Sequence, residues 1–405
     1  MRTLYISQTG MLEPLGQSQV IPYVVGLSRR GFEIEIISFE RQGSSQDDVS
    51  AMRRRLDADG VAWRPLVRRK SPRLSTKLTE SAVGVAHALV AALRRGPRIV
   101  HARSYFPAAI ADVVATVAPG ARLLFDARGM LGDEYVDAGY WRRDSTEYRL
   151  VKIFEKRLFR RSEGVVVLTR ALREWLLRAG MLGPQTSTEV IPCCVDTDRF
   201  KPDEAVRAQK REDLGLGDRV VVAYSGTLGA WYLEKEMARF VGLLKRTGMD
   251  VVFLVLSTSN TDNLRAAVHA EGLEARDFMT LCVRPEDMPK VLPAADLGLS
   301  FIQSCFSKMG SSPTKVAEYL AAGVPVVLNG DIGDQADLRC MPDACIVLSS
   351  FAEAELVLAA ERARILVGRS YAERAPAAAR VAETQFGLAN VGVRRYEKLY
   401  RTIAA

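Results

Sequence analysis

The sequence predicts an α/β protein built of two doubly wound parallel sheets, one after the other along the chain. Two observations carry this prediction. Short apolar segments of strand length alternate with amphipathic segments of helix length almost throughout, which is the pattern of parallel sheets covered by helices on both faces. The chain is also 405 residues long, which fits two domains better than one.

The first predicted sheet has seven strand-length segments, at Thr3–Ser7, Glu33–Phe39, Val61–Leu66, Arg98–Ala102, Arg122–Asp126, Gly164–Leu168 and Glu189–Ile191. The helices expected between them include Gln17–Arg30, Leu78–Arg94 and Tyr148–Arg161. These stretches are amphipathic, as expected of helices that cover one face of a sheet.

The second predicted sheet starts after a turn-rich segment at residues 191–202, IPCCVDTDRFKP. Its strands are expected at Val220–Ser225, Asp250–Leu256, Phe278–Cys282, Leu297–Phe301, Pro325–Leu328 and Cys345–Leu348. We therefore expect a first domain at residues 1–195 and a second at residues 196–387. Open α/β sheets bind ligands at the carboxyl ends of their strands, so functional residues are expected there.

Composition and cysteine usage indicate a globular protein of a reducing compartment. Hydrophobic residues make up 48% of the chain and charged residues 26%. The longest apolar runs, such as Val251–Leu256, are far shorter than the ~20 residues of a membrane span. The chain enters a strand directly, without a signal peptide's apolar segment, and its six cysteines lack C-x-x-C metal spacing. We therefore expect a cytoplasmic protein with reduced thiols.

Positive charge is concentrated in the first half of the chain. Residues 1–195 contain 30 Lys and Arg against 20 Asp and Glu, a balance of +10, whereas the remainder contains 26 against 28, a balance of −2. Such a surface attracts anionic lipid, nucleic acid or an acidic substrate, or it consists only of solvated helix faces. Interleaved aromatic residues or a nucleic-acid-binding module are not found, so no nucleic-acid partner is predicted.

The most informative segment is Ser311–Leu328, SSPTKVAEYLAAGVPVVL. It predicts a helix with Ser312 as its N-cap and Pro313 at its first position, ended by Gly323 and followed by an apolar strand. A helix start of this kind can bind phosphate through its free N–H groups. We include Ser312 and Thr314 among the expected ligand-binding residues for this reason.

Two charged side chains on this helix suit a nucleotide. Lys315 adds a mobile cation in the first turn, and Glu318 can accept hydrogen bonds from vicinal hydroxyls such as those of a ribose. An anion site beside a diol acceptor is what a nucleotide diphosphate sugar needs. The structural alternative is a solvated Lys/Glu pair, spaced i, i+3, on a capped helix.

The run Pro-Thr-Lys-x-x-Glu-Tyr-Leu-Ala-Ala-Gly-x-Pro-Val-Val, at residues 313–327, resembles the donor-binding segment of family 4 glycosyltransferases. These are retaining enzymes with the GT-B fold. The resemblance implies two Rossmann-like domains that face each other across a cleft, the second binding the nucleotide-sugar donor and the first the acceptor. It also implies that a last helix, roughly Leu388–Ile403, crosses back, so that the first domain includes residues 388–405.

The turn after the first strand is a second point of resemblance. Residues 14–40, PLGQSQVIPYVVGLSRRGFEIEIISFE, look like the opening of many family 4 enzymes, in which a glycine turn lets the backbone approach donor and acceptor. The resemblance gives that role to Gly16, which has no Cβ, and makes Gln17 a polar neighbour. Glycine-containing turns also occur in every doubly wound sheet, and G-x-G-x-x-G is absent.

The segments HARSY and FDARG close two neighbouring strands of the first domain. Many family members carry a histidine that contacts the transferred sugar where this chain has Arg128. Arg128 could instead clamp a phosphate or acidic group, or it could form a structural ion pair with Asp126 or Asp133. Arg103 is a candidate donor ligand, and His101 is expected to be a satisfied strand-end histidine.

The segment VAYSGTLG opens the second domain with a strand and a glycine loop, whose amides can bind a diphosphate. Family members usually supply an Arg after the first glycine and a Lys a few residues on. This chain has Thr227 and two aromatic residues there, one of them Tyr232. We carry over Gly226, Thr227 and Tyr232 as donor-binding residues. The departure leaves Lys315, with Lys308 as a second candidate, as the main cation for the leaving group.

Two further features concern the donor sugar and metals. Many relatives have two glutamates eight residues apart; Glu318 matches the second, but Gly310 stands at the first. That glutamate often contacts the transferred sugar, so the identity of the sugar stays open. Carboxylates in the segment Asn329–Asp334 are expected to cap a turn. We predict no metal site, and no cofactor besides the donor substrate.

The sequence as a whole predicts a retaining, metal-independent transfer of a sugar from a nucleotide diphosphate sugar to a hydroxyl of a saccharide or lipid-linked acceptor. Lys315 and the amides of the helix start and glycine loop would stabilise the leaving diphosphate. The basic first domain suggests contact with an anionic membrane surface, at the inner face. Two alternatives stay open: another GT-B enzyme, such as a nucleotide-sugar 2-epimerase, and a non-catalytic binding partner in glycan assembly.

Overall fold

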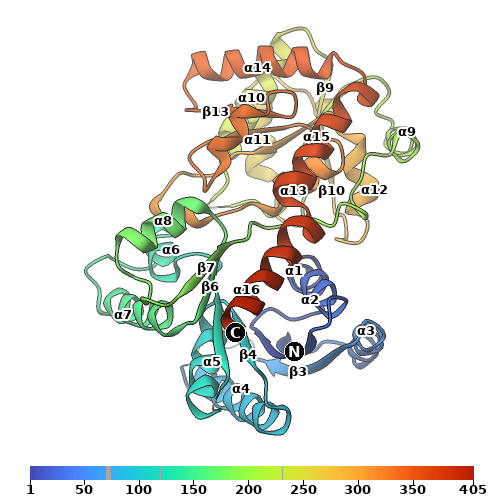
Figure 1. Ribbon diagram of the computed structural model, residues 1–405. Coiled ribbons are helices and arrows are strands. Elements are labelled where there is room, and N and C mark those ends of the chain that lie inside the picture. Colours follow the sequence, from blue (N-terminus) through green and yellow to red (C-terminus); the bar gives the residue numbers. More distant parts are fainter. Residues whose placement is uncertain (70–73, 119, 230) are drawn as a thin grey trace. The chain divides into compact units, whose positions relative to one another are not determined.

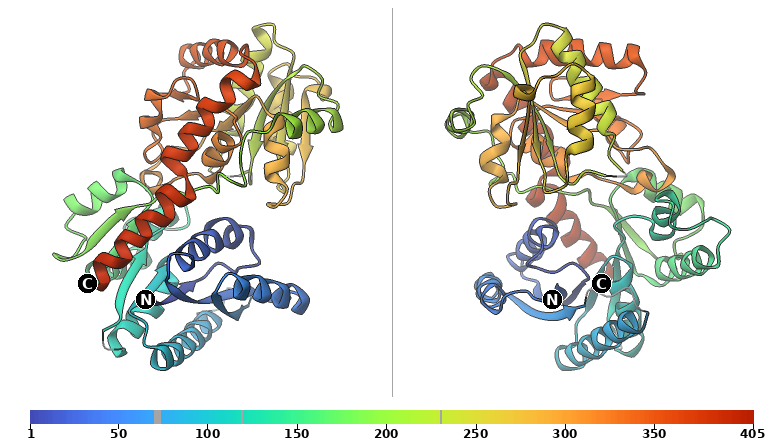
Figure 2. Two further views of the ribbon diagram at one scale, coloured as in Figure 1. Left: turned by 45° about the vertical axis from the view of Figure 1, so that its right-hand side comes forward. Right: turned by 180° about the vertical axis from the view of Figure 1, so that it is seen from behind.

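The computed structural model describes residues 1–69, 74–118, 120–229 and 231–405. The chain divides into two compact units, one of residues 1–192 and 388–405 (unit 1) and one of residues 193–387 (unit 2). Each unit is a parallel sheet with helices on both faces (Figures 1 and 2), as predicted. None of the helices in these described ranges has the length and apolar composition of a membrane span.

The sheet of unit 1 has seven strands in the order β3-β2-β1-β4-β5-β6-β7. They are β1 (Arg2–Ser7), β2 (Glu33–Arg41), β3 (Val61–Arg68), β4 (Ile99–Arg103), β5 (Arg122–Asp126), β6 (Gly164–Val167) and β7 (Ser187–Val190). All seven lie at the predicted places, with small shifts at their ends. The strand order reverses between β1 and β4, and at such a switch point the loops diverge and leave room for a ligand.

The helices of unit 1 are α1 (Pro14–Gln19), α2 (Ile21–Ser28), α3 (Gln46–Ala58), α4 (Leu74–Arg95), α5 (Tyr105–Val117), α6 (Leu131–Asp137), α7 (Thr146–Arg161) and α8 (Arg170–Arg178). The single helix predicted at Gln17–Arg30 is wrong. The chain breaks at Val20, whose φ of −124° and ψ of −63° are not helical. Pro22 explains the break, because its nitrogen has no hydrogen to donate to the carbonyl of Ser18.

The C-terminal segment belongs to unit 1. It consists of a π-helical turn, η5 (Leu388–Val393), and α16 (Arg394–Ala404). Its tyrosines reach the strand ends of the sheet. The hydroxyl of Tyr400 lies 2.7 Å from Nδ1 of His101, and the hydroxyl of Tyr396 donates to Asp126 at 2.9 Å. The sequence predicts one continuous helix here, and the structure differs by the π-helical turn.

The sheet of unit 2 has six strands in the order β10-β9-β8-β11-β12-β13. They are β8 (Val220–Ser225), β9 (Val251–Leu256), β10 (Phe278–Leu281), β11 (Leu297–Ser300), β12 (Val326–Asn329) and β13 (Cys345–Leu348). The order reverses between β8 and β11, so their carboxyl ends form the switch point of unit 2. β8 leads into the glycine loop and β11 leads towards the predicted phosphate-binding helix, so both segments start at this point.

The helices of unit 2 are α9 (Glu204–Asp213), α10 (Glu234–Arg246), α11 (Asp262–Ala270), α12 (Met288–Val291), α13 (Thr314–Ala321), α14 (Glu353–Val367) and α15 (Tyr371–Phe386). Short 3-10 helices are η1 (Ala275–Asp277), η2 (Leu292–Ala294), η3 (Phe306–Gly310) and η4 (Gln335–Cys340). α13 packs closely on the sheet. The ring of Tyr319 lies over Gly298 of β11, where a Cβ would come within 2.4 Å of it.

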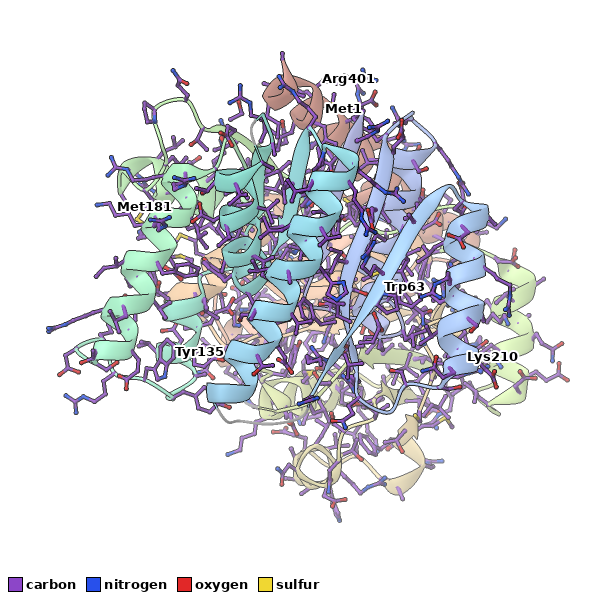
Figure 3. The ribbon with its side chains drawn as sticks, turned by 90° about the horizontal axis from the view of Figure 1, so that it is seen from below. Met1, Trp63, Tyr135, Met181, Lys210 and Arg401 are labelled. Carbon is purple, nitrogen blue, oxygen red and sulfur yellow. The ribbon has the colours of Figure 1, made fainter. Side chains whose placement is uncertain are left out.

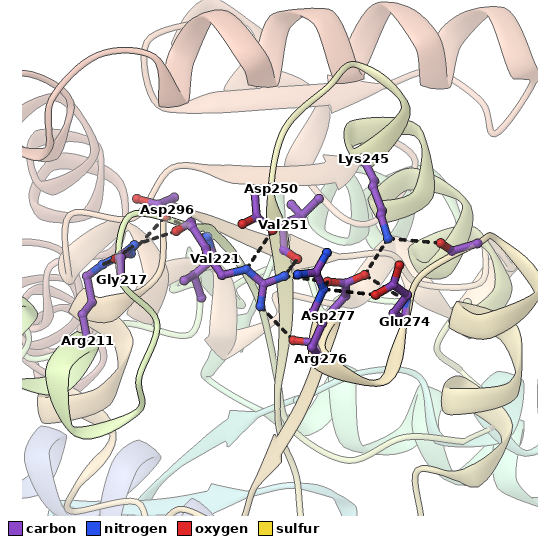
Figure 4. Close-up of polar contacts among 12 residues, drawn as sticks. Arg211, Gly217, Val221, Lys245, Asp250, Val251, Glu274, Arg276, Asp277 and Asp296 are labelled. Carbon is purple, nitrogen blue, oxygen red and sulfur yellow. Dashed lines mark hydrogen bonds and ion pairs between the residues drawn. The ribbon is translucent and has the colours of Figure 1, made fainter.

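Buried ion pairs fix the amino ends of two strands of unit 2 (Figure 4). Asp296, just before β11, accepts hydrogen bonds from Arg211 at 3.2 Å and from the N–H of Val221 at 2.8 Å. Asp277, just before β10, accepts one from Lys245 at 2.7 Å. These carboxylates are used for stability at the end of the sheet opposite to the switch point. The carboxyl ends of the strands are left for binding.

Candidate functional site

Lys315 lies in the first turn of α13, near the carboxyl end of β11. Only 8% of the surface of Lys315 is exposed. The Nζ atom lies 3.9 Å from the ring centroid of Tyr224 and 4.1 Å from that of Tyr232. Among the residues that the structure describes, none forms a hydrogen bond with this Nζ. The cation is therefore held by two aromatic faces, and its hydrogen-bonding capacity is available to a ligand.

Burial brings the pKa values of Lys315 and Glu318 together. It lowers the pKa of Lys315 to about 7, although the nearby Glu318 carboxyl acts in the opposite direction. It raises the pKa of Glu318 to about 7, against the attraction of Arg199 and Lys315. Both shifts follow from the cost of taking a charge out of water. A bound anion would favour the charged form of Lys315, so the site suits an anionic ligand.

The glycine loop after β8 lies next to Lys315. Gly226 has a φ of +120° and Gly229 a φ of +131°, values that residues with side chains rarely adopt. A Cβ at Gly226 would lie 3.3 Å from the Nζ of Lys315, whereas one at Gly229 would meet no described atom within 4 Å. Between the two glycines, the carbonyl of Thr227 accepts the hydroxyl of Tyr224 at 2.5 Å. The loop backbone thus approaches the cation because position 226 has no side chain.

A second lysine lies on η3, the short helix before α13. The Nζ of Lys308 is 3.6 Å from the ring centroid of Trp231, which follows the glycine loop. The carbonyl of Trp231 accepts the N–H of Gln303 at 2.8 Å. Lys308 and Trp231 are both partly exposed. The segments that follow β8 and β11 are therefore joined by a cation–π contact at the rim of the Lys315 site.

Two more buried side chains near the carboxyl ends of these strands have unpaired polar atoms. They are the hydroxyl of Ser300, the last residue of β11, and both polar atoms of the Gln335 amide, in the segment after β12. Neither side chain forms a hydrogen bond with the described residues. Buried polar groups are rarely left unpaired in proteins. Together with Lys315, they indicate that this edge of the sheet is built for a polar ligand.

The predicted N-cap role of Ser312 is wrong. α13 starts at Thr314, and Pro313, with a ψ of 119°, occupies the capping position without a side-chain hydrogen bond. Ser312 is then one residue too early for its hydroxyl to reach the first turn. Its hydroxyl instead accepts the N–H of Cys193 at 3.1 Å. Thr314 and Lys315 begin the helix, and their N–H groups have no partner within it.

Tyr224 is the part of the site that the sequence does not predict. It occupies an ordinary apolar position of β8, and nothing in the local pattern distinguishes it. Its contact with Lys315 depends on the packing of α13 beside β8, which is fixed by a hydrogen bond of 2.6 Å from the N–H of Ser225 to the hydroxyl of Tyr319. Tyr232, which the sequence does predict, contacts the same lysine, whereas the side chain of Thr227 is exposed.

In unit 1 the turn after β1 is fixed by close contacts within the turn and by hydrogen bonds to Glu40 of β2. A Cβ at Gly16 would lie 2.0 Å from the carbonyl oxygen of Gly10. The carboxylate of Glu40 accepts the N–H of Leu12 at 3.2 Å, and the Gln17 amide donates to the Leu12 carbonyl at 3.4 Å. The structure therefore explains Gly16 by a contact inside the turn. Contact of Gly16 and Gln17 with a ligand stays a prediction.

Asp126 is fully buried at the end of β5, and several polar side chains of this region contact it. Arg103 and Arg128 each place an Nη1 atom 3.3 Å from one of its oxygens, and the Tyr396 hydroxyl donates to it at 2.9 Å. The Nε2 atom of His101 lies 3.8 Å away. Burial alone would raise the pKa of Asp126, but Arg128, the His101 ring and Arg103 together hold it well below its usual range.

The Asp126 cluster contains the structural ion pair that the sequence left open for Arg128. His101 is buried, its Nδ1 atom lies 2.7 Å from the Tyr400 hydroxyl, and burial lowers its pKa. The prediction of a satisfied strand-end histidine therefore holds at Nδ1, whereas Nε2 forms no hydrogen bond with the described residues. The ion pairs with Asp126 hold the guanidinium groups of Arg103 and Arg128 at the strand ends. Contact of either arginine with a substrate stays a prediction.

The segment after β12 forms a turn. Asn329 donates to Asp331 at 2.6 Å and bonds the N–H and carbonyl of Ile302 at 3.0 and 2.9 Å. The carboxylate of Asp331 thus caps the turn, as the sequence predicts. Within the described ranges, no group of three His, Cys, Asp or Glu side chains is arranged to hold a metal ion.

Comparison with known sequences identifies a family. Residues 19–194 match the family described as glycosyl transferase 4-like domain. The GDP-mannose-dependent α-(1-6)-phosphatidylinositol monomannoside mannosyltransferase of Mycobacterium tuberculosis is 26% identical over 227 residues, 54% of this chain and 56% of the relative. The α-D-kanosaminyltransferase of Streptomyces kanamyceticus is 26% identical over 152 residues, 36% of this chain and 39% of the relative. The chain spans about half the length of the curated relatives it matches.

Solved structures show the same fold over the whole chain. HepE of Anabaena, in complex with UDP-glucose, has a TM-score of 0.71 at 17% identity, covering 99% of this chain and 100% of that one. The sucrose-phosphate synthase of Thermosynechococcus elongatus has a TM-score of 0.71 at 13% identity, covering 100% and 99%. At such low identities the likeness concerns the fold alone.

The chain consists of two units, each a parallel sheet with alternating helices, and it has the GT-B fold of these solved structures. Residues 19–194 match the glycosyl transferase 4-like domain, and this match agrees with the resemblance to family 4 glycosyltransferases found in the sequence.

Proposed function

We propose that this chain is a retaining hexosyltransferase that moves a sugar from a nucleotide diphosphate sugar to a hydroxyl of a saccharide or lipid-linked acceptor. The observation that carries the proposal is the buried ammonium of Lys315, which has two aromatic faces but no hydrogen-bond partner among the described residues. A diphosphate would supply the missing acceptors. The family match supports glycosyl transfer as the reaction.

Departure of the nucleoside diphosphate is the step that this site would assist. The bond between C1 of the sugar and the β-phosphate oxygen breaks, and negative charge grows on the phosphate. Lys315 would donate to these oxygens, together with N–H groups at the start of α13 and along the loop at residues 226–229. Preorganised donors stabilise such charge without reorganisation. We therefore propose that the transfer needs no divalent metal ion.

The acceptor hydroxyl would attack C1 from the face that the diphosphate leaves. A new C1–oxygen bond forms as the old one breaks, and the hydroxyl proton passes to a departing phosphate oxygen. The configuration at C1 is then retained without a nucleophile from the protein. We assign donor binding to unit 2 and acceptor binding to unit 1, where Arg103 and Arg128 would meet an acidic or phosphorylated group.

Glu318 would hold the ribose of the donor. It lies one turn after Lys315 on α13 and is partly exposed. Its ionised carboxylate can accept both ribose hydroxyls, and bonds to a charged acceptor are stronger than those to a neutral one. Because its pKa is about 7, this contact would be complete only above neutral pH.

The similar proteins support a nucleotide diphosphate hexose as the donor, but they differ in the base and in the sugar. The mycobacterial mannosyltransferase depends on GDP-mannose and acts on a phosphatidylinositol monomannoside, while HepE was crystallised with UDP-glucose. A cytoplasmic enzyme acting on a lipid-linked acceptor at the inner membrane face is consistent with the first of these. The excess of positive charge in residues 1–195 also supports it.

The test is a thermal-shift screen against UDP, GDP, ADP, dTDP and CMP, each with and without Mg²⁺. A ligand at one hundred times its Kd stabilises the folded protein by ~2.7 kcal/mol, which gives a clear rise in Tm. We expect a rise with one nucleoside diphosphate that is equal with and without metal. The rise should disappear in Lys315→Ala and persist in Lys235→Ala, because Lys235 is an exposed lysine on α10.

No shift with any of these nucleotides would contradict the proposal and favour a non-catalytic partner in glycan assembly. A shift that requires Mg²⁺ would overturn metal independence while keeping the donor site. Incubation of the donor without acceptor separates the remaining alternative, since a nucleotide-sugar 2-epimerase would convert the sugar and a transferase would not.

A further inference from the structure

Large apolar side chains are exposed within a short stretch of unit 1. The exposed fractions are 41% for Tyr135, 76% for Tyr140, 62% for Leu150 and 67% for Ile153. Tyr135 belongs to α6 and is labelled in Figure 3, and its ring packs on that of Trp141 with 4.4 Å between centroids. Leu150 and Ile153 lie one turn apart on α7. Exposed apolar side chains that lie close together in the chain are candidates for an interaction site.

Basic residues dominate the same stretch. Residues 140–161 contain eight Lys and Arg against three Asp and Glu, a balance of +5. Part of this charge stabilises the fold, because Arg157 and Arg161 pair with Asp112 of α5 at 2.9 and 2.7 Å. These two arginines tie α7 to the rest of unit 1.

Three other basic residues of α7 have no such role. Arg149, Lys156 and Arg160 are exposed, and none of the ion pairs found among the described residues includes them. They flank Leu150 and Ile153 on the helix. α7 lies at the outer edge of unit 1 in Figure 1. The stretch therefore combines a net positive charge with exposed apolar groups.

We propose that this surface, formed by Tyr135, Tyr140, Leu150, Ile153, Arg149, Lys156 and Arg160, docks onto a bilayer that contains anionic lipids. Tyrosine and tryptophan rings favour the boundary between head groups and acyl chains. Aliphatic side chains on a basic helix add apolar contact with that boundary, and Lys and Arg are attracted to anionic head groups. The net positive charge selects an anionic partner, and the apolar groups distinguish a bilayer from a dissolved anion.

Unit 2 offers a matched surface without the charge. Leu358 and Ile365 of α14 are 56% and 61% exposed, close to the values for Leu150 and Ile153. The helix that carries them, Glu353–Val367, contains three glutamates and two arginines, a balance of −1. It therefore serves as a control for apolar exposure alone.

The test is co-sedimentation of the full chain with phosphatidylcholine vesicles, with and without phosphatidylglycerol, at moderate salt and without nucleotide. We expect binding only to vesicles with phosphatidylglycerol. Arg149→Gln/Lys156→Gln/Arg160→Gln should weaken it by about 100-fold, roughly fivefold for each charge. Leu150→Ser/Ile153→Ser should also weaken it, whereas Leu358→Ser/Ile365→Ser should not. Thermal unfolding of each variant checks that it is folded.

Failure to bind phosphatidylglycerol vesicles, or equal binding by all variants, would overturn the proposal. Equally tight binding to duplex DNA at the same salt would also overturn it, since the surface would then be a general polyanion site. The inference does not depend on the proposed donor chemistry. The nucleotide thermal shift, measured on the same variants, should be unchanged when vesicle binding is lost, so the two proposals fail separately.

Discussion

The position that a Cβ atom would take at Gly226 lies 3.3 Å from the Nζ atom of Lys315. This relationship joins the glycine loop after β8 to the first turn of α13. Backbone conformation alone does not explain the glycine, because Gly229 has a similar φ but open space beside it. Position 226 must stay free so that the loop and a ligand can approach the same cation.

Gly226→Ala is therefore expected to weaken binding of the preferred nucleoside diphosphate about tenfold or more, ~1.4 kcal/mol. Gly229→Ala is the control, because it introduces comparable strain, ~1–3 kcal/mol, without a contact to Lys315. Both variants should lose thermal stability, but only Gly226→Ala should lose affinity in a titration. If both lose affinity equally, strain in the loop is the cause and the contact is irrelevant.

Lys315→Met is expected to raise the free energy of unfolding while it abolishes diphosphate binding. The pKa of Lys315 falls from 10.5 to about 7 on folding. At about 1.4 kcal/mol for each pKa unit, burial of its charge destabilises the folded protein at neutral pH by ~4–5 kcal/mol. Methionine fills the space between Tyr224 and Tyr232 without charge and packs well on aromatic rings. Urea unfolding measures the change, with Lys235→Met as control. A less stable Lys315→Met would show that the ring contacts outweigh the cost of burial.

Donor affinity is expected to fall as pH rises above about 7. In the free protein Lys315 loses its proton near that pH, whereas a bound diphosphate keeps it charged. Binding above neutral pH therefore takes up a proton, and Kd rises by up to about tenfold for each pH unit. Ionisation of Glu318, whose pKa is also about 7, acts in the opposite direction, because the ionised carboxylate is the form that binds the ribose hydroxyls more strongly. The measured decrease is therefore the part of the Lys315 effect that exceeds the gain at Glu318. Tyr224 and Tyr232 stay neutral because burial raises their pKa values.

The intact nucleotide sugar is the better ligand for this measurement, because its diphosphate diester does not titrate near neutral pH. Calorimetry in buffers of different ionisation enthalpy counts the protons taken up. The alkaline decrease should be absent in Lys315→Arg, because the guanidinium group stays charged throughout this pH range. A pH-independent Kd in the wild-type protein would mean that Lys315 is charged before the ligand arrives.

Asp126→Asn is expected to destabilise unit 1 by ~3–5 kcal/mol, because it leaves Arg103 and Arg128 beside a neutral group. The carboxyl pKa is held below its usual value in the folded protein, so its contribution is present above pH 3.8 and is lost as pH falls further. The difference in Tm between wild type and variant should therefore narrow in acid. Asp144→Asn, which removes an exposed ion pair with Arg142, should leave Tm unchanged at both pH values.

The sequence predicts the strands well because the buried strands of parallel sheets are continuous apolar runs. Val220–Ser225 and Cys345–Leu348 lie where the pattern puts them. The single helix predicted across Val20 is wrong. The pattern of apolar residues continues past Pro22, but the helical backbone is interrupted before this proline. The N-cap predicted at Ser312 is wrong because Pro313 is extended, so that the helix starts one residue later than predicted.

The site residues also differ in how far the local sequence predicts them. Lys315 and Glu318 are predicted because their spacing and their place at a helix start are written in the chain. The burial of these two side chains cannot be predicted from the sequence, because it depends on β8 and β11 being neighbours and on the ring of Tyr224 contacting Lys315. Contacts between segments far apart in the chain leave no periodic signal, so the aromatic faces around Lys315 and the ion pairs of Asp126 become visible only in the fold.

The ribose contact proposed for Glu318 can be isolated with a double-mutant cycle. One arm replaces the residue, Glu318→Gln, and the other replaces the ligand, using the 2′-deoxy form of the preferred nucleoside diphosphate. Each single change should cost about tenfold or more in Kd at a pH above 7, since a hydrogen bond to a charged group contributes ~1.5–3 kcal/mol. Glutamine keeps the size of the side chain, but it has one acceptor oxygen in place of two.

If Glu318 binds the 2′-hydroxyl, the two changes remove the same interaction, and the second should then cost little once the first is made. The cycle must be run above pH 7, because the carboxyl group is half protonated near that value and a protonated Glu318 behaves much like the glutamine. At lower pH the wild-type protein should therefore approach the variant in its preference for the ribose. Fully additive losses at high pH would show that Glu318 acts through the charge of Lys315 and does not contact the ribose.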